Sequence, residues 1–164
     1  MGQNRHPVIR VFDCHVARPA AGGGLEFLLL HRAPGRIYAG DWRMVGGKLE
    51  GEETAWQACI RELQEETGLV PSRLFTVPFL NRFYEWSHDR VNEIPVFLAL
   101  TSGTDPTLDG EHDDFAWLSP AETARRLPWP GQRGGLDAAA TLYADERLWP
   151  HLEIRVPPGP ESLP

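Results

Sequence analysis

The sequence has little cysteine, almost no lysine and no long apolar run. Its 164 residues include two cysteines, and the formal net charge is −7. No apolar run approaches the roughly 20 residues of a membrane-spanning helix. Arg10 and Asp13 interrupt the first strand-like segment, which argues against a signal peptide. We therefore expect a cytoplasmic protein with no membrane partner.

The two cysteines, Cys14 and Cys59, are too few for a disulfide framework. Each falls within an apolar pattern, which favours a role as a small buried hydrophobic side chain over redox or metal chemistry. Lys48 is the only lysine in the chain. Codon bias explains this scarcity as readily as function does, but the position of Lys48 in a glycine-rich turn makes it a candidate substrate contact.

The acidic balance argues against a nucleic-acid partner, because sequence-independent binding to nucleic acid needs a cationic face. It does not exclude a small phosphorylated substrate, since bound cations can reverse the local field. A chain of this length suits one domain. We expect that domain at residues 1–156, followed by a loose Pro-rich tail at 157–164.

Hydrophobic periodicity predicts several strands around one strong helix. The helix is expected at about 54–67, where Trp56, Cys59, Ile60 and Leu63 form one apolar stripe and Gly68 marks the end. Later helices are expected from Ser119-Pro120 and over 136–147. This order predicts an α/β fold with a mixed sheet between helices. The expected strands lie at 7–17, 25–32, 42–45, 74–86, 93–100 and 115–118.

The strong helix carries its carboxylates on one face. At 100° per residue, Glu62, Glu65 and Glu66 fall within an arc of roughly 100°, beside the apolar stripe. Such a face is commonly solvated, but the preceding Gly46-Gly47 and the adjacent Arg61 favour a bound cation. Mg²⁺ suits these residues because it takes oxygen ligands and often bridges carboxylate to phosphate. Zn²⁺ would want His or Cys at ligand spacing, which the helix lacks.

The segment 47–69 resembles the signature of the Nudix (MutT-type) hydrolases, G-x5-E-x7-R-E-U-x-E-E-x-G-U, where U is aliphatic. The resemblance implies the Nudix α/β/α sandwich. It also implies a pyrophosphohydrolase that acts on a nucleoside diphosphate linked to another moiety, with Mg²⁺ as cofactor and Mn²⁺ as a substitute. The fixed positions are filled by Gly47, Glu53, Arg61, Glu62, Leu63, Glu65, Glu66, Gly68 and Leu69.

The same resemblance assigns roles to single residues of the metal site. Glu62 and Glu66 would be the main metal ligands, and the carbonyl of Gly46 would complete the first metal shell. Glu65 would bind a second ion or help to deprotonate water. The physical logic is metal-ion catalysis, in which cations neutralise the diphosphate and acidify an attacking water.

Three further residues complete the expected catalytic set. Arg61 would pair with Glu53 and hold the loop on the helix, and Glu53 is also a candidate base. Residues 111–118 resemble an E-H-x-x-x-x-W-L segment that follows the central strands in many of these enzymes. Glu111 is therefore a candidate metal ligand or general base, with a solvated loop acid as the alternative. Trp117 is expected to pack in the core.

The substrate is predicted from weaker features. Val45 stands where proline is common, and 127–133 looks like a stretch found in the subgroup that hydrolyses dATP-like and dihydroneopterin triphosphates. A (deoxy)nucleoside triphosphate, cleaved to monophosphate and pyrophosphate, is the leading hypothesis. Tyr84 favours a dinucleoside polyphosphate as the second choice, and ADP-ribose is the third. A nucleotide sensor without catalysis is the alternative from another class.

Several side chains are candidates for binding this small-molecule nucleotide. An aromatic ring can stack on a base, and an arginine can reach a triphosphate tail, although core packing and surface ion pairs are the ordinary roles of such residues. Relatives are often dimers and the chain shows no clear interface signal, so a homodimer is left open. The candidates for substrate contact are Arg32, Trp42, Arg43, Lys48, Tyr84, Gln132 and Arg133.

Overall fold

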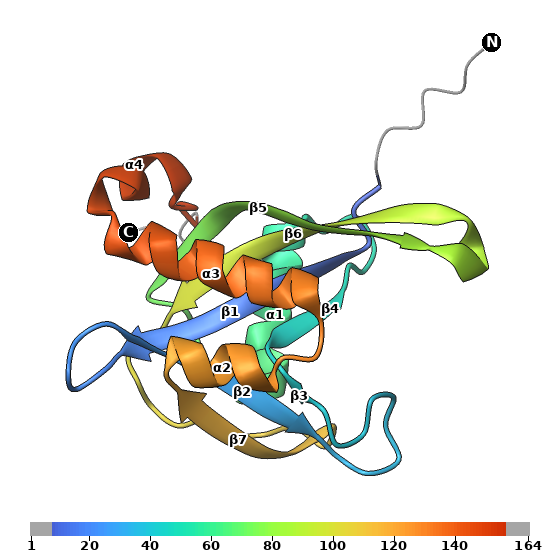
Figure 1. Ribbon diagram of the computed structural model, residues 1–164, viewed down its shortest axis with the longest axis horizontal. Coiled ribbons are helices and arrows are strands. Elements are labelled where there is room, and N and C mark those ends of the chain that lie inside the picture. The colour runs from blue at the N-terminus through green and yellow to red at the C-terminus, as the bar shows by residue number, and fades with distance from the viewer. Residues whose placement is uncertain (1–7, 157–164) are drawn as a thin grey trace, which may run out of the picture.

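The computed structural model describes residues 8–156, and the predicted tail at 157–164 lies outside that range. A seven-stranded mixed sheet with the order β3-β2-β1-β6-β5 forms its centre, and β4 pairs with β1 and β7 with β2. Helix α1 covers one face of the sheet, whereas α2 and α3 cover the other (Figure 1). The predicted α/β sandwich is confirmed. None of the helices in 8–156 has the length and apolar character needed to cross a membrane.

The strands lie close to the predicted ranges, except that one predicted strand is divided into two. The expected strand at 42–45 is split into two short strands by Met44. The bounds are β1 (Val11–Pro19), β2 (Leu25–Arg32), β3 (Trp42–Arg43), β4 (Val45–Lys48), β5 (Arg73–Glu85), β6 (Arg90–Leu100) and β7 (His112–Leu118). The helices are α1 (Ala55–Thr67), α2 (Pro120–Arg126), α3 (Pro130–Ala144) and α4 (Trp149–Leu152), with 3-10 turns η1 (Trp86–His88) and η2 (Glu146–Leu148).

Two apolar clusters hold the layers together, one on each face of the sheet. Alternation along β1 places Phe12 and Cys14 in the cluster under α1, while Ala17 joins the cluster under α3. Cys14 and Cys59 are both fully buried, as predicted. Burial of these two faces is what fixes α1 against the centre of the sheet.

The glycine pair before α1 belongs to a strand, which corrects the expectation of a turn there. In the β1–β4 register Gly46 lies opposite Asp13 and Gly47 opposite Phe12. The chain turns later, around Gly51, which has φ +53°. Because successive strand residues face opposite sides, Gly47 faces α1 and Gly46 faces the side of the sheet covered by α3.

Helix α1 begins and ends close to the predicted residues. Thr54 caps it through a capping box, in which the Thr54 hydroxyl accepts from Gln57 N–H and the Gln57 side chain accepts from Thr54 N–H. Gly68 takes the left-handed conformation at φ 68° and ends the helix. The apolar stripe enters the core through Cys59 and Leu63. This orientation sets the carboxylate face of α1 beside β4.

Helix α3 begins at Pro130, six residues before the predicted start at Leu136. The glycines near its beginning allow close packing. A Cβ at Gly134 would lie 2.7 Å from the ring of Phe79. Pro130 fits because the first helical residue needs no N–H partner. The helix ends at Ala144, and η2 and α4 replace its predicted last turn.

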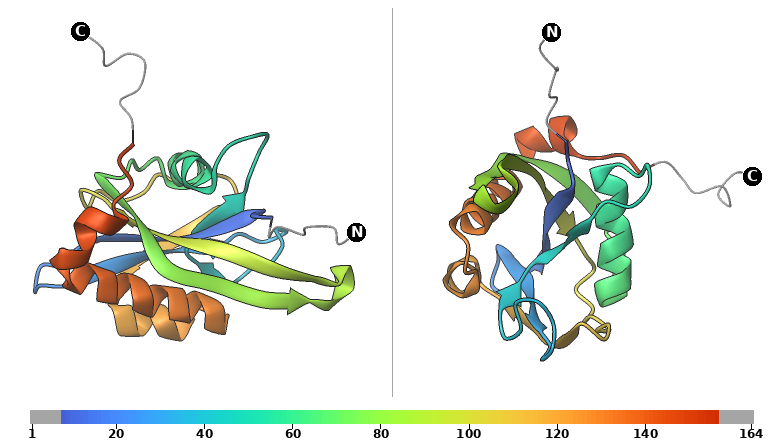
Figure 2. Two further views of the ribbon diagram at one scale, coloured as in Figure 1. Left: turned by 90° about the horizontal axis from the view of Figure 1, so that it is seen from above. Right: turned by 90° about the vertical axis from the view of Figure 1, so that its right-hand side faces the viewer.

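Pro95 lies at a bulge between β5 and β6. The β5–β6 register shifts between Thr76 and Leu80, directly opposite Pro95. Beyond this point the two strands continue as a ribbon that extends past the rest of the sheet, which Figure 2 shows from above.

Candidate metal centre

Three segments far apart in the sequence bring charged side chains around Glu66. Helix α1 supplies Glu62, the end of β2 supplies Arg32, and the turn before β7 supplies Asp109 and Glu111. The three carboxylates raise the pKa of Glu66, and Arg32 lowers it. The structure thus places Arg32 and Glu111, both predicted site residues, near the carboxylate face of α1.

The Glu66 carboxylate is the least satisfied group of this cluster. Glu66 is 8% exposed. Burial, followed by repulsion from Glu62 and Asp109, raises its pKa to about 9. Its protonated form is favoured in the protein alone because burial and the neighbouring carboxylates disfavour the charge. A cation at this carboxylate would remove the cause of the shift.

Glu62 lies directly against the backbone of β4. A Cβ built on Gly47 would come within 2.7 Å of the Glu62 carboxyl. Only glycine therefore allows the Glu62 side chain to lie where it does. Burial raises the pKa of Glu62, and Arg61 opposes that shift.

Arg61 ties the loop after β4 to the helix, as predicted. Its Nη2 donates to Glu53 Oε1 at 2.6 Å and its Nε to Glu53 Oε2 at 3.1 Å. Nη2 also donates to the Lys48 carbonyl at 3.1 Å. Nη1 donates to Glu62 at 2.8 Å and to Glu65 at 3.2 Å. One guanidinium thus holds β4, the loop and the helix together.

Glu53 is fully engaged by this network. In addition to its bonds with Arg61, its Oε1 accepts from the Glu50 N–H at 2.7 Å. The bonds from Arg61 lower the pKa of Glu53. A carboxylate stabilised in this way is a weak base, so the geometry supports its holding role more than a role in proton transfer.

Two residues that sequence reasoning did not select lie here, Asp109 in the turn before β7 and His112 at the first position of β7. Asp109 Oδ1 accepts from the Glu111 N–H at 3.1 Å and lies 2.9 Å from His112 Nδ1. Arg32 Nη1 donates to Glu111 Oε2 at 2.7 Å and lies 3.5 Å from His112 Nε2. The motif around Glu111 included His112, but only the fold brings it to Arg32.

These residues fit a hard divalent cation by their chemistry. The groups around Glu66 are carboxylates, the ligand type that Mg²⁺ and Mn²⁺ prefer. Arg61 pairs with Glu62 and Glu65, so these side chains are partly neutralised by protein. In the arrangement described for 8–156, no three His, Cys, Asp or Glu side chains converge as a ready-made metal site. The repulsion between buried Glu66 and the carboxylates around it is the feature that a bound cation would relieve.

Among the predicted substrate contacts, three lie on the β3–β4 segment. Trp42 contacts the ring of His31, with centroids 5.0 Å apart, and the Arg126 guanidinium lies over the Trp42 ring at 4.7 Å from its centroid. Arg43 lies over the Tyr38 ring at 4.7 Å. Lys48 is exposed at the end of β4. All three remain predictions as substrate contacts.

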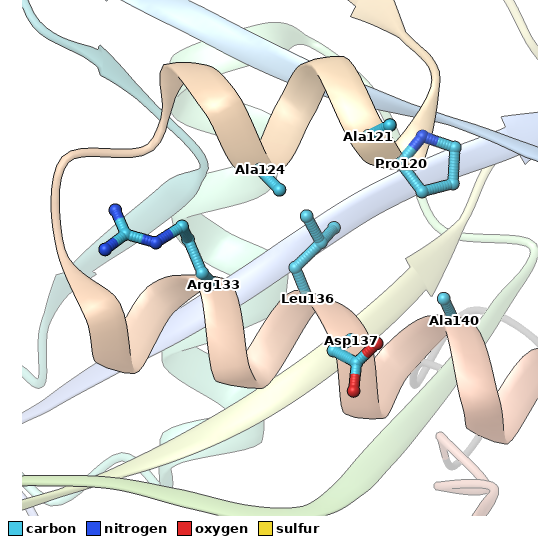
Figure 3. A pocket seen from close by; sticks show the side chains of 7 residues that line it. All are labelled: Pro120, Ala121, Ala124, Arg133, Leu136, Asp137 and Ala140. Atoms are coloured by element: carbon cyan, nitrogen blue, oxygen red, sulfur yellow. The ribbon is translucent and has the colours of Figure 1, made fainter.

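The other predicted contacts lie elsewhere. Tyr84 is 59% exposed near the tip of the β5–β6 ribbon, and its hydroxyl donates to Asp89 at 2.8 Å. Gln132 and Arg133 belong to α3, on the face of the sheet opposite α1. Arg133 lines a groove between α2 and α3 (Figure 3) and donates to the Leu127 carbonyl at 2.7 Å. The structure does not bring Arg133 to the acidic cluster.

A buried polar group on the α3 face was also missed from the sequence. Asp13 and His15 point from β1 toward α3, where Asn81 donates to Asp13 at 3.0 Å. Burial raises the pKa of Asp13 and lowers that of His15 to about 4. His15 Nε2 and Gln132 Oε1 have no hydrogen-bond partner among residues 8–156. Alternation along β1 was the available signal, but Asp13 and His15 read as an interruption of the apolar pattern.

Comparison with protein families gives one family match. The model of the NUDIX domain matches residues 10–138 of this chain. This region contains the sheet, helix α1 and the beginning of α3.

Curated relatives match over different shares of their length. The octanoyltransferase of Myxococcus xanthus is 34% identical over 135 residues, which are 77% of this chain and 35% of that protein. The chain thus spans about a third of that relative. The nucleoside triphosphatase NudI of Salmonella typhimurium is 30% identical over 107 residues, 60% of this chain and 76% of NudI.

A solved structure agrees with the fold. The Ap4A hydrolase of C. elegans, crystallised as a binary complex, superposes with a TM-score of 0.67 at 22% identity. The match covers 84% of this chain and 98% of that one. At this identity the likeness concerns the fold alone.

Proposed function

The chain belongs to the Nudix family, and from that premise we propose that it is a Mg²⁺-dependent pyrophosphohydrolase. Its substrate is a nucleoside diphosphate linked to another moiety, and a (deoxy)nucleoside triphosphate is the leading candidate. The products are then the monophosphate and pyrophosphate.

The observation that carries this proposal is the state of Glu66. A carboxylate with 8% exposure among three other carboxylates is unfavourable without a cation. Solvated surface glutamates do not show such a shift. A divalent ion held by Glu62 and Glu66, with the Gly46 carbonyl, would neutralise the repulsion and make the burial favourable.

The chain's own residues perform the remaining tasks. When bound, the cation supplies charge neutralisation at the diphosphate and acidification of water. Arg61 holds Glu62 beside β4, and Arg32, whose positive charge acts on Glu66, can pair with phosphate. Glu65 and Glu111 have side-chain exposures of 59% and 45%, which leaves each open to accept a proton from water. We place proton transfer on one of these two rather than on Glu53.

A triphosphate substrate is favoured by two features. Val45 and segment 127–133 resemble the subgroup that hydrolyses dATP-like triphosphates. NudI, which is named a nucleoside triphosphatase, is 30% identical over 107 residues. Trp42 remains a predicted contact for the base, and Arg43 remains a predicted contact for the triphosphate tail.

A dinucleoside polyphosphate is the second candidate and ADP-ribose the third. Tyr84 supports the dinucleoside substrate, because its exposed ring at the end of the ribbon is free to stack on a second base. A nucleotide sensor is the candidate from another class. All the carboxylates at the fixed positions of the Nudix signature are present, which favours catalysis over sensing.

The test is a substrate screen in H₂¹⁸O with Mg²⁺ or Mn²⁺. The panel contains dATP and other triphosphates, a dinucleoside tetraphosphate, ADP-ribose and a nucleotide sugar. We expect triphosphates to give monophosphate and pyrophosphate, with ¹⁸O in one product identifying the phosphorus attacked. Cleavage restricted to the dinucleoside compound or ADP-ribose would overturn the triphosphate assignment.

The matched variants are Glu66→Gln and, as control, Glu146→Gln at an exposed position on η2. Glu66→Gln should lose about 10³-fold or more in kcat while keeping its folded circular-dichroism spectrum. The control should keep wild-type turnover. Nucleotide binding without turnover in the wild-type protein would favour the sensor.

A further inference from the structure

The positive charge of Arg32 lowers the pKa of buried Glu66, and the position of Arg32 is set by its neighbours on the turn before β7 and on β7 itself. Its side chain is 15% exposed. Nη1 points to two acceptors from one short segment, the Glu111 carboxylate and the Nε2 atom of His112. Such a guanidinium has little freedom to choose another position.

The hydrogen-bond partners of His112 determine which ring nitrogen carries the hydrogen. The Nδ1 atom lies 2.9 Å from a carboxylate oxygen of Asp109, which is an acceptor. The Nε2 atom faces the Arg32 guanidinium, which is only a donor. Both contacts are satisfied when hydrogen is on Nδ1 and the Nε2 lone pair accepts from Arg32.

The backbone explains why these residues meet. Arg32 lies opposite His112 in the β2–β7 register, and the register shifts between His31 and Arg32. The shift leaves Asp113 unpaired in the ladder, where it contacts His31 at 2.6 Å. Because the ladder skips Asp113, His112 lies directly opposite Arg32. His112 is buried, with a side-chain exposure of 3%, so the contact is sheltered from solvent.

We propose that His112 and Asp109 are positioning residues that aim Arg32 at the polyphosphate of the substrate. Asp109 fixes the His112 ring through Nδ1, and Nε2 of His112 holds the guanidinium beside Glu66 and Glu111. Arg32 then presents its remaining N–H groups to an anionic ligand as a prearranged phosphate contact. This inference rests on the proposed function, because it assumes that a polyphosphate occupies the acidic site with Mg²⁺.

The proposed contacts of His112 predict different effects for two substitutions at this position. Phenylalanine at position 112 keeps the ring volume but removes both nitrogens. Glutamine keeps an acceptor at a reach close to that of Nε2. A purely structural histidine would tolerate phenylalanine at least as well as glutamine, because the site is buried. A positioning histidine should show the opposite order in ligand affinity.

The test is a double-mutant cycle measured by calorimetry with Mg²⁺ and inorganic tripolyphosphate, a probe that contains no base. His112→Phe and Arg32→Ala should each weaken binding about 10-fold, and the double variant should also be about 10-fold weaker rather than about 100-fold. His112→Gln should recover most of the affinity. His151→Phe, at an exposed position on α4, is the matched control and should bind as wild type.

Additive losses, or equal affinity of His112→Phe and wild type, would overturn the inference. A wild-type protein that binds no tripolyphosphate would overturn it as well. A long-range ¹H–¹⁵N spectrum gives a second, variant-free readout. Hydrogen on Nδ1 of His112 is expected, and hydrogen on Nε2 alone would exclude the Arg32 contact.

The proposed function fails by a different result, which is the absence of turnover across the nucleotide panel. Tripolyphosphate binding with coupled variants but no turnover would retain the positioning roles and remove the hydrolase. Nucleotide turnover together with additive losses of affinity in the two variants would retain the hydrolase and remove the positioning roles.

Discussion

At the scale of single residues, Gly47 is the position where the strand, the helix and the proposed ion meet. The site has no room for a Cβ, because that atom would lie 2.7 Å from the Glu62 carboxyl. The Glu62 side chain is flexible at its end and can move away from an added methyl group. A substitution should therefore disturb the metal site more than the fold.

We predict that Gly47→Ala weakens Mg²⁺ binding by about 10- to 100-fold, the range seen when metal ligands lose their supports. Its unfolding midpoint in denaturant should stay close to that of wild type. Calorimetric titration with Mg²⁺ measures the first quantity. Gly22→Ala is the control, because a Cβ there meets no atom within 4 Å. Equal Mg²⁺ affinity in both variants would contradict the argument.

Glu66 predicts a pH dependence of stability for the metal-free protein. Its pKa in the folded chain is about 9, above its ordinary value of 4.5. The folded state therefore binds more protons than the unfolded state between these values, and its stability falls as pH rises through that window. The full contribution is present below pH 4.5.

Glu66→Gln removes this titration. In EDTA at pH 8 the variant should be more stable than wild type, by about 2–4 kcal/mol, since one pKa unit corresponds to about 1.4 kcal/mol and relaxation reduces the effect. The advantage should shrink toward pH 5. Urea unfolding at several pH values measures it, and a constant difference across pH would be inconsistent with a buried carboxylate.

At the scale of elements, α1 and the loop before it behave as one unit because of Arg61. The guanidinium bonds to the Lys48 carbonyl and to Glu53 in the loop as well as to carboxylates of the helix. A lysine in its place keeps the charge but lacks the planar fork that makes paired bonds.

Arg61→Lys should therefore lower kcat/KM by at least about 10-fold, because Glu62 and the loop lose their common support. We expect a smaller effect on folding, about 1–2 kcal/mol, since the network is partly exposed. Steady-state kinetics and urea unfolding separate the two effects. Arg125→Lys, on the exposed surface of α2, provides a control with the same chemical change. Wild-type kinetics in Arg61→Lys would show that the fork is dispensable.

At the scale of the whole molecule, the acidic site joins segments from different parts of the chain. Glu66 belongs to α1, Arg32 to the end of β2 and Glu111 to the turn before β7. An ion bound among them ties these segments in the folded state only. Binding should therefore raise global stability by linkage.

We expect Mg²⁺ at about 100 times its Kd to stabilise the protein by about 2.7 kcal/mol and EDTA to reverse this. For a domain of this size the melting temperature should rise by about 5–10 °C. Differential scanning calorimetry measures the shift. Glu66→Gln should show a much smaller response to Mg²⁺ than Glu146→Gln, whereas equal responses would place the ion elsewhere.

The chain's local chemistry was sufficient for helix α1 and its acidic face. The apolar stripe and the Gly68 stop are local features, so the sequence locates them, whereas the capping box at Thr54 is seen only in the structure. The Arg61–Glu53 pair also agrees with expectation, since Glu53 directly precedes the N-cap of α1 and Arg61 lies within that helix. Local pattern placed the start of α3 six residues late, because the packing of Gly134 against Phe79 depends on the tertiary structure.

The sequence by itself predicted the α/β class from the order of its strands and helices, and it predicted helix α1 and the carboxylates that favour an ion from the spacing within that helix. Tertiary structure alone decided that Glu66 is buried, that Gly46-Gly47 lies in a strand, and that His112 meets Arg32 across 79 intervening residues. These facts depend on sheet register and on a bulge between β2 and β7. Register is set by the packing of both faces of the sheet at once, which no short stretch of sequence specifies.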